Sequence, residues 1–196
     1  MTSRAEQKER TRQTLVAESR RLFAAKGYAA VGLAEIVRES GVTKGALYHH
    51  FDGKPALFRA VLEQVQQEVA ARVVAAAEAT DDPWDRLCNG CAAFVEAGTD
   101  PEVQRIMLID GPAVLGWSEW RAIDETTSAA HLAEALTELV ADGTITPQPV
   151  APLTRLLSGA MNEAALWLAQ STGPTDLEDT LTALSQLLES LRYRNQ

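Results

Sequence analysis

The sequence predicts an all-α protein of about nine helices, and three observations support this class. The 196 residues are rich in Ala and Leu, and 46% of them are hydrophobic, which is ample to bury a core. Apolar residues recur at helical spacing nearly throughout, and no alternating β-branched run is long enough for a sheet strand. Asp-Pro pairs and single Gly residues also stand where helices begin or end.

Three helices are expected in the N-terminal part. The first runs from about Glu6 to Lys26, and an amphipathic two-turn helix follows over Leu33 to Ser40. Gly41 comes next, where a left-handed C-terminal cap is wanted, and Thr43 is suited to cap a third helix. Two helices joined by a tight glycine turn predict a helix-turn-helix, whose second helix enters the major groove of DNA.

The later helices are predicted from the residues at their ends. A long helix starts in the turn around Pro55, a residue acceptable only in a first turn, and crosses into the second part of the chain. Domains of residues 1–53 and 54–196 are therefore expected. Further predictions are helices from Pro83, Pro101, Trp117, Pro152 and Thr175, a chain break at Asp110-Gly111-Pro112, an uninterrupted helix from Trp117 to Ala141, and a capping box between Thr175 and Glu178.

The net charge of −9 conceals two parts of opposite sign. Residues 1–60 contain eleven Lys and Arg against six Asp and Glu, a net of +5. Residues 61–196 contain seven Arg, no Lys and twenty-one Asp and Glu, a net of −14. A positive field around the helix-turn-helix favours double-stranded DNA as the partner, and the acidic remainder should orient the basic end toward it.

The residues from Gly41 to Phe51 read Gly-Val-Thr-Lys-Gly-Ala-Leu-Tyr-His-His-Phe. Together with Gly27-Tyr28, Ile36 and Lys54, they resemble the DNA-binding domain of the tetracycline-repressor (TetR) family of bacterial regulators. The resemblance covers about the first third of the chain. One departure is Val31-Gly32, where the family commonly has Thr-Ser; the change removes a hydroxyl cap and a possible phosphate contact.

The resemblance implies a homodimeric transcriptional regulator, most simply a repressor, with a ligand-binding and dimerisation domain after the helix-turn-helix. A small apolar or aromatic effector would release it from a palindromic operator. The predicted DNA contacts are Thr43, Lys44, Gly45, Ala46, Tyr48, His49, His50 and Lys54. Lys44 can reach a phosphate or guanine, while Lys54 stands beside a helix N-terminus that also attracts anions. A pair of solvated helices in an unrelated helical protein is the alternative.

The acidic part is expected to hold a ligand pocket and a dimer interface. Candidate pocket residues are Met107, Asp110, Trp117, Trp120, His131, Asn162 and Trp167, although any single Trp can equally belong to the core. Candidate interface residues, on the apolar stripes of the last two helices, are Leu153, Leu157, Met161, Leu168, Leu177, Leu181, Leu184 and Leu188. A two-fold four-helix bundle would pair these helices, and packing within one chain is the alternative.

Two other functions are weighed. Cys88 and Cys91 share a helix face, but Asp85 opposes the charge of Arg86, so buried structural cysteines are expected rather than a thiol switch. A helical enzyme with an incidental basic N-terminus would need a nucleophile elbow, a phosphate loop or a Ser/His/Asp set, and none is apparent.

No cofactor or metal is expected. Adjacent helical residues such as His49 and His50 point about 100° apart and cannot easily chelate one ion. A signal peptide, a membrane partner and a spanning segment are not expected either, because no apolar stretch is long enough, and a cytoplasmic location follows by default.

Overall fold

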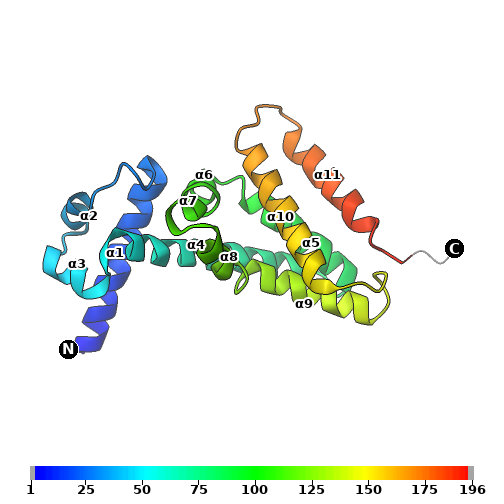
Figure 1. Ribbon diagram of the computed structural model, residues 1–196, viewed down its shortest axis with the longest axis horizontal. Coiled ribbons are helices and arrows are strands. Elements are labelled where there is room, and N and C mark those ends of the chain that lie inside the picture. The colour runs from blue at the N-terminus through cyan, green and yellow to red at the C-terminus, as the bar shows by residue number, and fades with distance from the viewer. Residues whose placement is uncertain (1–2, 194–196) are drawn as a thin grey trace.

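The computed structural model describes residues 3–193 and is built from helices (Figure 1). In chain order they are α1 (Arg4–Lys26), α2 (Leu33–Ser40), α3 (Lys44–His50), α4 (Gly53–Ala77), α5 (Pro83–Ala97), α6 (Pro101–Val103), the π-helix η1 (Gln104–Asp110), α7 (Gly111–Leu115), α8 (Trp117–Asp124), α9 (Ser128–Ala141), α10 (Val150–Leu168) and α11 (Asp176–Glu189). Extended pairing among these residues is limited to one bridge, between Ile145 and Arg192. The all-α class is confirmed.

A small bundle of α1, α2 and α3 with the start of α4 forms one end of the molecule (Figure 1). Its core holds Phe23, Ile36, Leu47 and Phe58, all fully buried. The rings of Phe23 and Phe58 meet edge to face with centroids 5.4 Å apart, an arrangement that aromatic pairs favour. α4 then leaves this bundle and enters the larger body.

The body is a helical stack in which α4 packs along α5 and α9, α10 packs on α5 and α9, and α11 lies against α5 and α10 (Figure 1). The predicted caps at its helix starts are confirmed. Asp82 accepts a hydrogen bond from the backbone N–H of Asp85 at 2.9 Å, and Asp100 accepts one from Glu102 at 2.8 Å. In each case a proline follows the cap, so its missing N–H removes no helical bond.

The predicted break at Asp110-Gly111-Pro112 is wrong. The π-helix η1 leads directly into α7, and Pro112 occupies the first turn of α7, where a proline is tolerated. The chain turns instead at Gly116, whose φ of +80° lies in the region that favours glycine.

The uninterrupted helix from Trp117 to Ala141 is also wrong, because α8 ends at Asp124. The hydroxyls of Thr126 and Thr127 both donate to the carbonyl of Ile123, which competes with continuation of the helix. The capping box at Thr175 does not form either. Its hydroxyl donates to Asp179 at 3.0 Å, and no side chain caps α11.

None of the helices within residues 3–193 is both long enough and apolar enough to cross a membrane.

Candidate nucleic-acid interface and effector cavity

The turn between α2 and α3 is set by two residues. Gly41 has φ +64° and ψ 13°, the left-handed conformation that ends α2. Thr43 then caps α3, with its hydroxyl oxygen accepting from the backbone N–H of Ala46 at 3.2 Å. The hydroxyl proton of Thr43 stays available as a donor. These local contacts fix the direction of α3 relative to α2.

One face of α3 is open to solvent. Lys44, Gly45, Tyr48 and His49 are exposed, whereas Leu47 on the opposite face is fully buried. A Cβ added to Gly45 would meet nothing within 4 Å, so another backbone could approach closely there. The exposed face therefore presents hydrogen-bond donors and a small residue, while the opposite face of α3 packs on the core. A helix that contacts base edges in the major groove requires this arrangement.

His50 lies differently from the exposed residues of α3. It is half-buried, and its ring centroid is 6.4 Å from that of Phe51. Burial lowers the pKa of His50, and the charges of His49, Lys8 and Arg12 lower it further. The imidazole is therefore driven toward its neutral form, which makes it a weaker phosphate ligand than a cation would be.

Lys54 is held by its own chain. The side chain is half-buried, and its Nζ lies 4.0 Å from the centroid of the Tyr28 ring, close enough for a cation–π contact. Burial lowers the pKa of Lys54. Lys54 thus links the start of α4 to the segment after α1, in addition to any contact with a phosphate.

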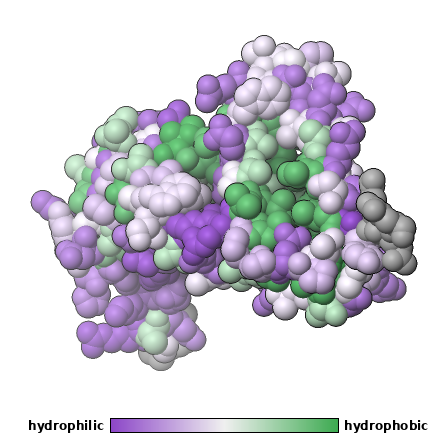
Figure 2. Space-filling model, turned by 45° about the vertical axis from the view of Figure 1, so that its right-hand side comes forward, coloured by the Kyte–Doolittle hydropathy of each residue, from purple (hydrophilic) through white to green (hydrophobic). Residues whose placement is uncertain are grey.

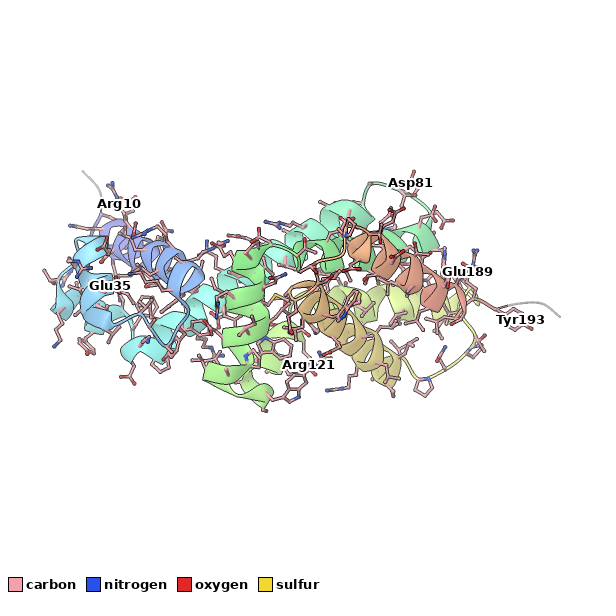
Figure 3. The ribbon with its side chains drawn as sticks, turned by 90° about the horizontal axis from the view of Figure 1, so that it is seen from above. Arg10, Glu35, Asp81, Arg121, Glu189 and Tyr193 are labelled. Carbon is pink, nitrogen blue, oxygen red and sulfur yellow. The ribbon has the colours of Figure 1, made fainter. Side chains whose placement is uncertain are left out.

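The first half of α1 carries cations that the sequence analysis did not single out. Arg4, Lys8 and Arg10 are exposed, and Arg12 is half-buried with its guanidinium 5.5 Å from the Phe51 ring centroid. Within residues 3–193, none of the four has a carboxylate within 4.0 Å. Figure 3 shows Arg10 at the same end of the molecule as Glu35, far from Asp81 and Glu189.

Most other cations of the N-terminal part are neutralised. The Lys and Arg side chains with carboxylate partners are Arg20, Arg21, Lys26, Arg38 and Arg59. The free positive charge therefore gathers on the start of α1 and on Lys44 of α3. Charge counting along the sequence found the basic part, but only the packing shows which of its cations remain available.

The start of α2 has no side-chain cap. Its N-cap residue is Gly32, which is exposed with φ −98° and ψ 151°, and no side chain bonds the first amides of the helix. Val31 is buried in the core instead. The missing hydroxyl cap predicted from Val31-Gly32 is confirmed, so no side chain satisfies the first backbone N–H groups of α2.

The body grips the end of α1 through η1 and α6. Asp110 accepts a hydrogen bond from the backbone N–H of Tyr28 at 2.8 Å. Arg20 joins α1 to α4 and α6, because its guanidinium donates to Glu68 of α4 at 2.6 and 2.7 Å and to Glu102 of α6 at 2.7 Å. Asp110 was expected in a ligand pocket; it instead connects the body to the N-terminal bundle.

A cavity of about 350 Å³ lies in the body between α4, α5, α9 and α10. Much of its wall is apolar, including Val73, Leu87, Phe94, Leu132 and Met161. At one end it reaches three buried polar residues, Asp124, Ser128 and Ser158. Its size and mixed lining are those of a site for a small molecule.

The predicted pocket residues do not gather at this cavity, and only His131 lines it. Trp120 is buried in the core, with its Nε1 donating to the carbonyl of Met107 at 2.8 Å. Trp117 and Trp167 are on the surface, 66% and 51% exposed. Asn162 is buried beside Ser158, 3.5 Å from its hydroxyl. The bond from Trp120 to Met107 satisfies the indole N–H, and the Trp120 and Met107 side chains are both 2% exposed, so neither faces open space.

The predicted interface residues divide into two groups. Leu153, Leu157, Met161 and Leu188 are at most 7% exposed, because they pack inside the subunit and cannot supply contact surface to a second chain. The others are half-buried or, for Leu177, 36% exposed.

Different side chains form the open apolar face of α10 and α11. Leu156 is 72% exposed, Trp167 51% and Leu187 46%. Figure 2 shows a broad apolar area, bordered by hydrophilic side chains, on the face that carries α10. The signal for this face in the sequence is a second apolar row on α10, Leu156, Gly159, Ala160 and Trp167, beside the row that is buried.

The two cysteines are shielded. Cys91 is 4% exposed, and burial raises the pKa of its thiol to about 12. Cys88 is half-buried, and burial also raises its pKa. Reactive thiols need the opposite shift. Within residues 3–193, no group of His, Cys, Asp and Glu is arranged to hold a metal ion.

Two family models match the chain. The model described as bacterial regulatory proteins, tetR family, covers residues 15–61, and that described as tetracyclin repressor-like, C-terminal domain, covers residues 84–191. The solved structure of a TetR-family transcriptional regulator from Pectobacterium atrosepticum is 33% identical, with a TM-score of 0.79 over 100% of both chains.

Two further proteins are similar. The transposon Tn10 TetC protein of Escherichia coli is 28% identical over 149 residues, 76% of this chain and 75% of that protein. RolR in complex with resorcinol shares the fold, with a TM-score of 0.72 and 19% identity over 94% of this chain and 90% of that one.

Proposed function

Because the chain belongs to the TetR family of DNA-binding transcriptional regulators, we propose that it acts as a homodimeric repressor that leaves a palindromic operator when a small molecule enters the cavity of its body. The observation that carries this proposal is the open face of α3, flanked by cations without carboxylate partners.

In the proposed complex each subunit places α3 in a major groove. Lys44 and Tyr48 lie where base edges and phosphates are reached, and the start of α1 carries Lys8 and Arg10 toward the phosphate backbone. Two half-sites about one helical turn, roughly 34 Å, apart would be read by the two copies of α3. The acidic body keeps the rest of the molecule away from DNA.

The second subunit would cover the open face of α10 and α11. Leu156, Trp167 and Leu187 are large apolar side chains left in solvent, and Gly159 lies between them with nothing within 4 Å of an added Cβ. Large aromatic and aliphatic side chains around a small residue suit close helix pairing across a two-fold axis. The interface would thus use the face of α10 that carries Leu156 and Trp167, beside the buried row of Leu153 and Leu157.

Release from DNA would pass through η1. The cavity is lined by Asp124 at the end of α8, and Trp120 of α8 donates to the carbonyl of Met107 in η1. η1 in turn holds the backbone of Tyr28 through Asp110. An effector that moves α8 would therefore shift the end of α1 and the spacing of the two reading helices. Such coupling is typically about 1–3 kcal/mol.

A thiol-responsive regulator is less well supported. Cys91 lines the cavity, but its thiol is buried and strongly disposed to stay protonated, and Cys88 is shifted in the same direction.

The proposal is tested by titrating the protein into labelled duplexes from the DNA that flanks its gene. We expect two chains per operator, and we expect Tyr48→Ala to weaken binding at least tenfold. Tyr193→Ala is the matched control, because Tyr193 is 57% exposed against 51% for Tyr48 but lies at the far end of the chain. Equal loss of affinity in both variants, or one chain per operator, would contradict the proposed docking.

A further inference from the structure

The polar end of the effector cavity is assembled from three helices. Asp124 comes from α8, Ser128 from α9 and Ser158 from α10, and they are 1%, 8% and 3% exposed. Three nearly buried polar side chains facing one cavity are costly to maintain without hydrogen-bond partners. Their remaining hydrogen-bonding capacity therefore indicates what the cavity is built to receive.

That remaining capacity is mainly for accepting hydrogen bonds. Arg121 donates to Asp124 Oδ2 at 3.0 Å and to Ser158 Oγ at 2.9 Å, and Ser158 Oγ also lies 3.4 Å from Asp124 Oδ2. No residue within 3–193 forms a hydrogen bond with Asp124 Oδ1 or with Ser128 Oγ. A ligand that donates hydrogen bonds at this end would satisfy both atoms.

The rim of the cavity is acidic. Glu78, Glu134 and Glu138 line it together with the guanidinium of Arg86 and the imidazole of His131, whose Nδ1 is 3.6 Å from Glu134. At the polar end the charge of Asp124 is already offset by Arg121 at 3.0 Å. Three carboxylates against one guanidinium make the approach to the cavity unfavourable for an anion and favourable for a cation.

The remainder of the wall is apolar, and it limits the size of the ligand. Leu87, Phe94, Leu132 and Met161 surround a space of about 350 Å³, at the lower end of the range of roughly 300–1,000 Å³ for ligand pockets. The space suits a small organic molecule whose apolar part packs against these side chains.

We propose that the effector is a small organic cation, with an apolar body against α4, α5 and α9 and one protonated amine donating to Asp124 Oδ1 and Ser128 Oγ. This inference rests on the proposed function, in which the same cavity receives the effector. It names the chemical class: amines bind, isosteric alcohols bind less tightly, and carboxylates are excluded.

Three probes with the same phenylpropyl group but different head groups test which head group the cavity prefers. 3-Phenylpropylamine, 3-phenylpropan-1-ol and 3-phenylpropanoate are titrated into the full chain by calorimetry at low salt. We expect the amine to bind at least tenfold more tightly than the alcohol, and the carboxylate to show no binding. Equal or tighter binding of the alcohol or of the carboxylate would overturn the proposal, as would absence of binding by the amine.

Two variants locate the binding. The double variant Glu134→Gln, Glu138→Gln removes exposed rim charges without disturbing the core. It should lower the affinity for the amine at least tenfold and leave the affinity for the alcohol unchanged. Glu96→Gln, an exposed residue of α5 that does not line the cavity, is the control and should change the affinity for neither probe. Unchanged amine affinity in the double variant would overturn the proposal.

Failure of the inference is distinguishable from failure of the proposed function. Operator binding by the same preparation is measured with no probe present. A protein that binds its operator as a dimer but takes up no amine keeps the proposed DNA-binding activity and loses the proposed ligand class.

Discussion

Replacing Lys8 by alanine isolates the contribution of α1 to DNA binding. Lys8 is exposed and has no carboxylate within 4.0 Å among the described residues, so its removal breaks no ion pair and costs little stability. Its charge nevertheless reaches the end of α3, because Lys8 is among the groups that lower the pKa of His50. In the proposed complex, a cation in this position would lie beside the DNA that α3 contacts.

The magnitude follows from counterion release. Each phosphate contact contributes about 0.9 to the slope of log affinity against log salt, so the loss of Lys8 from both subunits lowers the slope by about 1.8. Between 50 and 200 mM salt, a slope difference of about 1.8 corresponds to about a twelvefold change in relative affinity. Between these two salt concentrations, the fold-loss of operator affinity should therefore be about twelvefold smaller for the variant than for the parent.

Fluorescence anisotropy with labelled operator at four salt concentrations measures both slopes. Arg72→Ala is the control, because it removes the same charge from an exposed position on the distant half of α4, where screening of about 10 Å at 0.1 M isolates it from the DNA. Equal slopes for the parent and Lys8→Ala would refute the placement of α1 against the phosphates.

Four further outcomes are expected. Gly32→Ser restores a hydroxyl at the start of α2 and should raise operator affinity at least about fivefold, since each new hydrogen bond contributes about 0.5–1.5 kcal/mol in each of two subunits; unchanged affinity in a filter-binding assay would contradict this. Leu156→Glu should convert dimer to monomer in sedimentation velocity with unaltered helical circular dichroism, because the side chain is 72% exposed; a persistent dimer would place the interface elsewhere. The double variant Cys88→Ser, Cys91→Ser should respond to peroxide like the parent, since burial keeps both thiols protonated; a gel-shift difference between them would revive the thiol switch. Asp110→Ala leaves a backbone N–H without its acceptor and should lower the free energy of unfolding by about 1–3 kcal/mol in urea titrations, so an unchanged midpoint would show that the contact is unimportant.

The helix-turn-helix could be predicted because its determinants are local. Gly41 ends α2 in a left-handed conformation and Thr43 caps α3 three residues before its partner amide. Such signals depend only on neighbouring residues. Local signals also misled at Pro112, because a proline after Gly marks a break unless it falls in the first turn of a new helix, as it does in α7.

The sequence predicts a pocket in the acidic part but not its lining, because the residues that form the cavity are distant in the sequence. Ser128 and Ser158 meet only when α9 packs on α10, and Arg121 reaches Ser158 across 37 residues. A large aromatic side chain suggests a ligand contact, but Trp120 is buried in the hydrophobic core. The proposed dimer face shows the same limit: α10 has two apolar rows, and only packing decides that Leu157 faces inward and Leu156 outward.

The proposal that a dimer reads DNA through α3 is tested most directly by selecting ligands from a library of randomised duplexes. The parent chain should enrich a sequence with two inverted half-sites whose centres lie about one helical turn, roughly 34 Å, apart. Lys44→Ala should change the preferred bases within each half-site while keeping their separation, because Lys44 stands at the exposed start of α3. Enrichment of a single unpaired site, or an identical sequence from both proteins, would contradict the proposal.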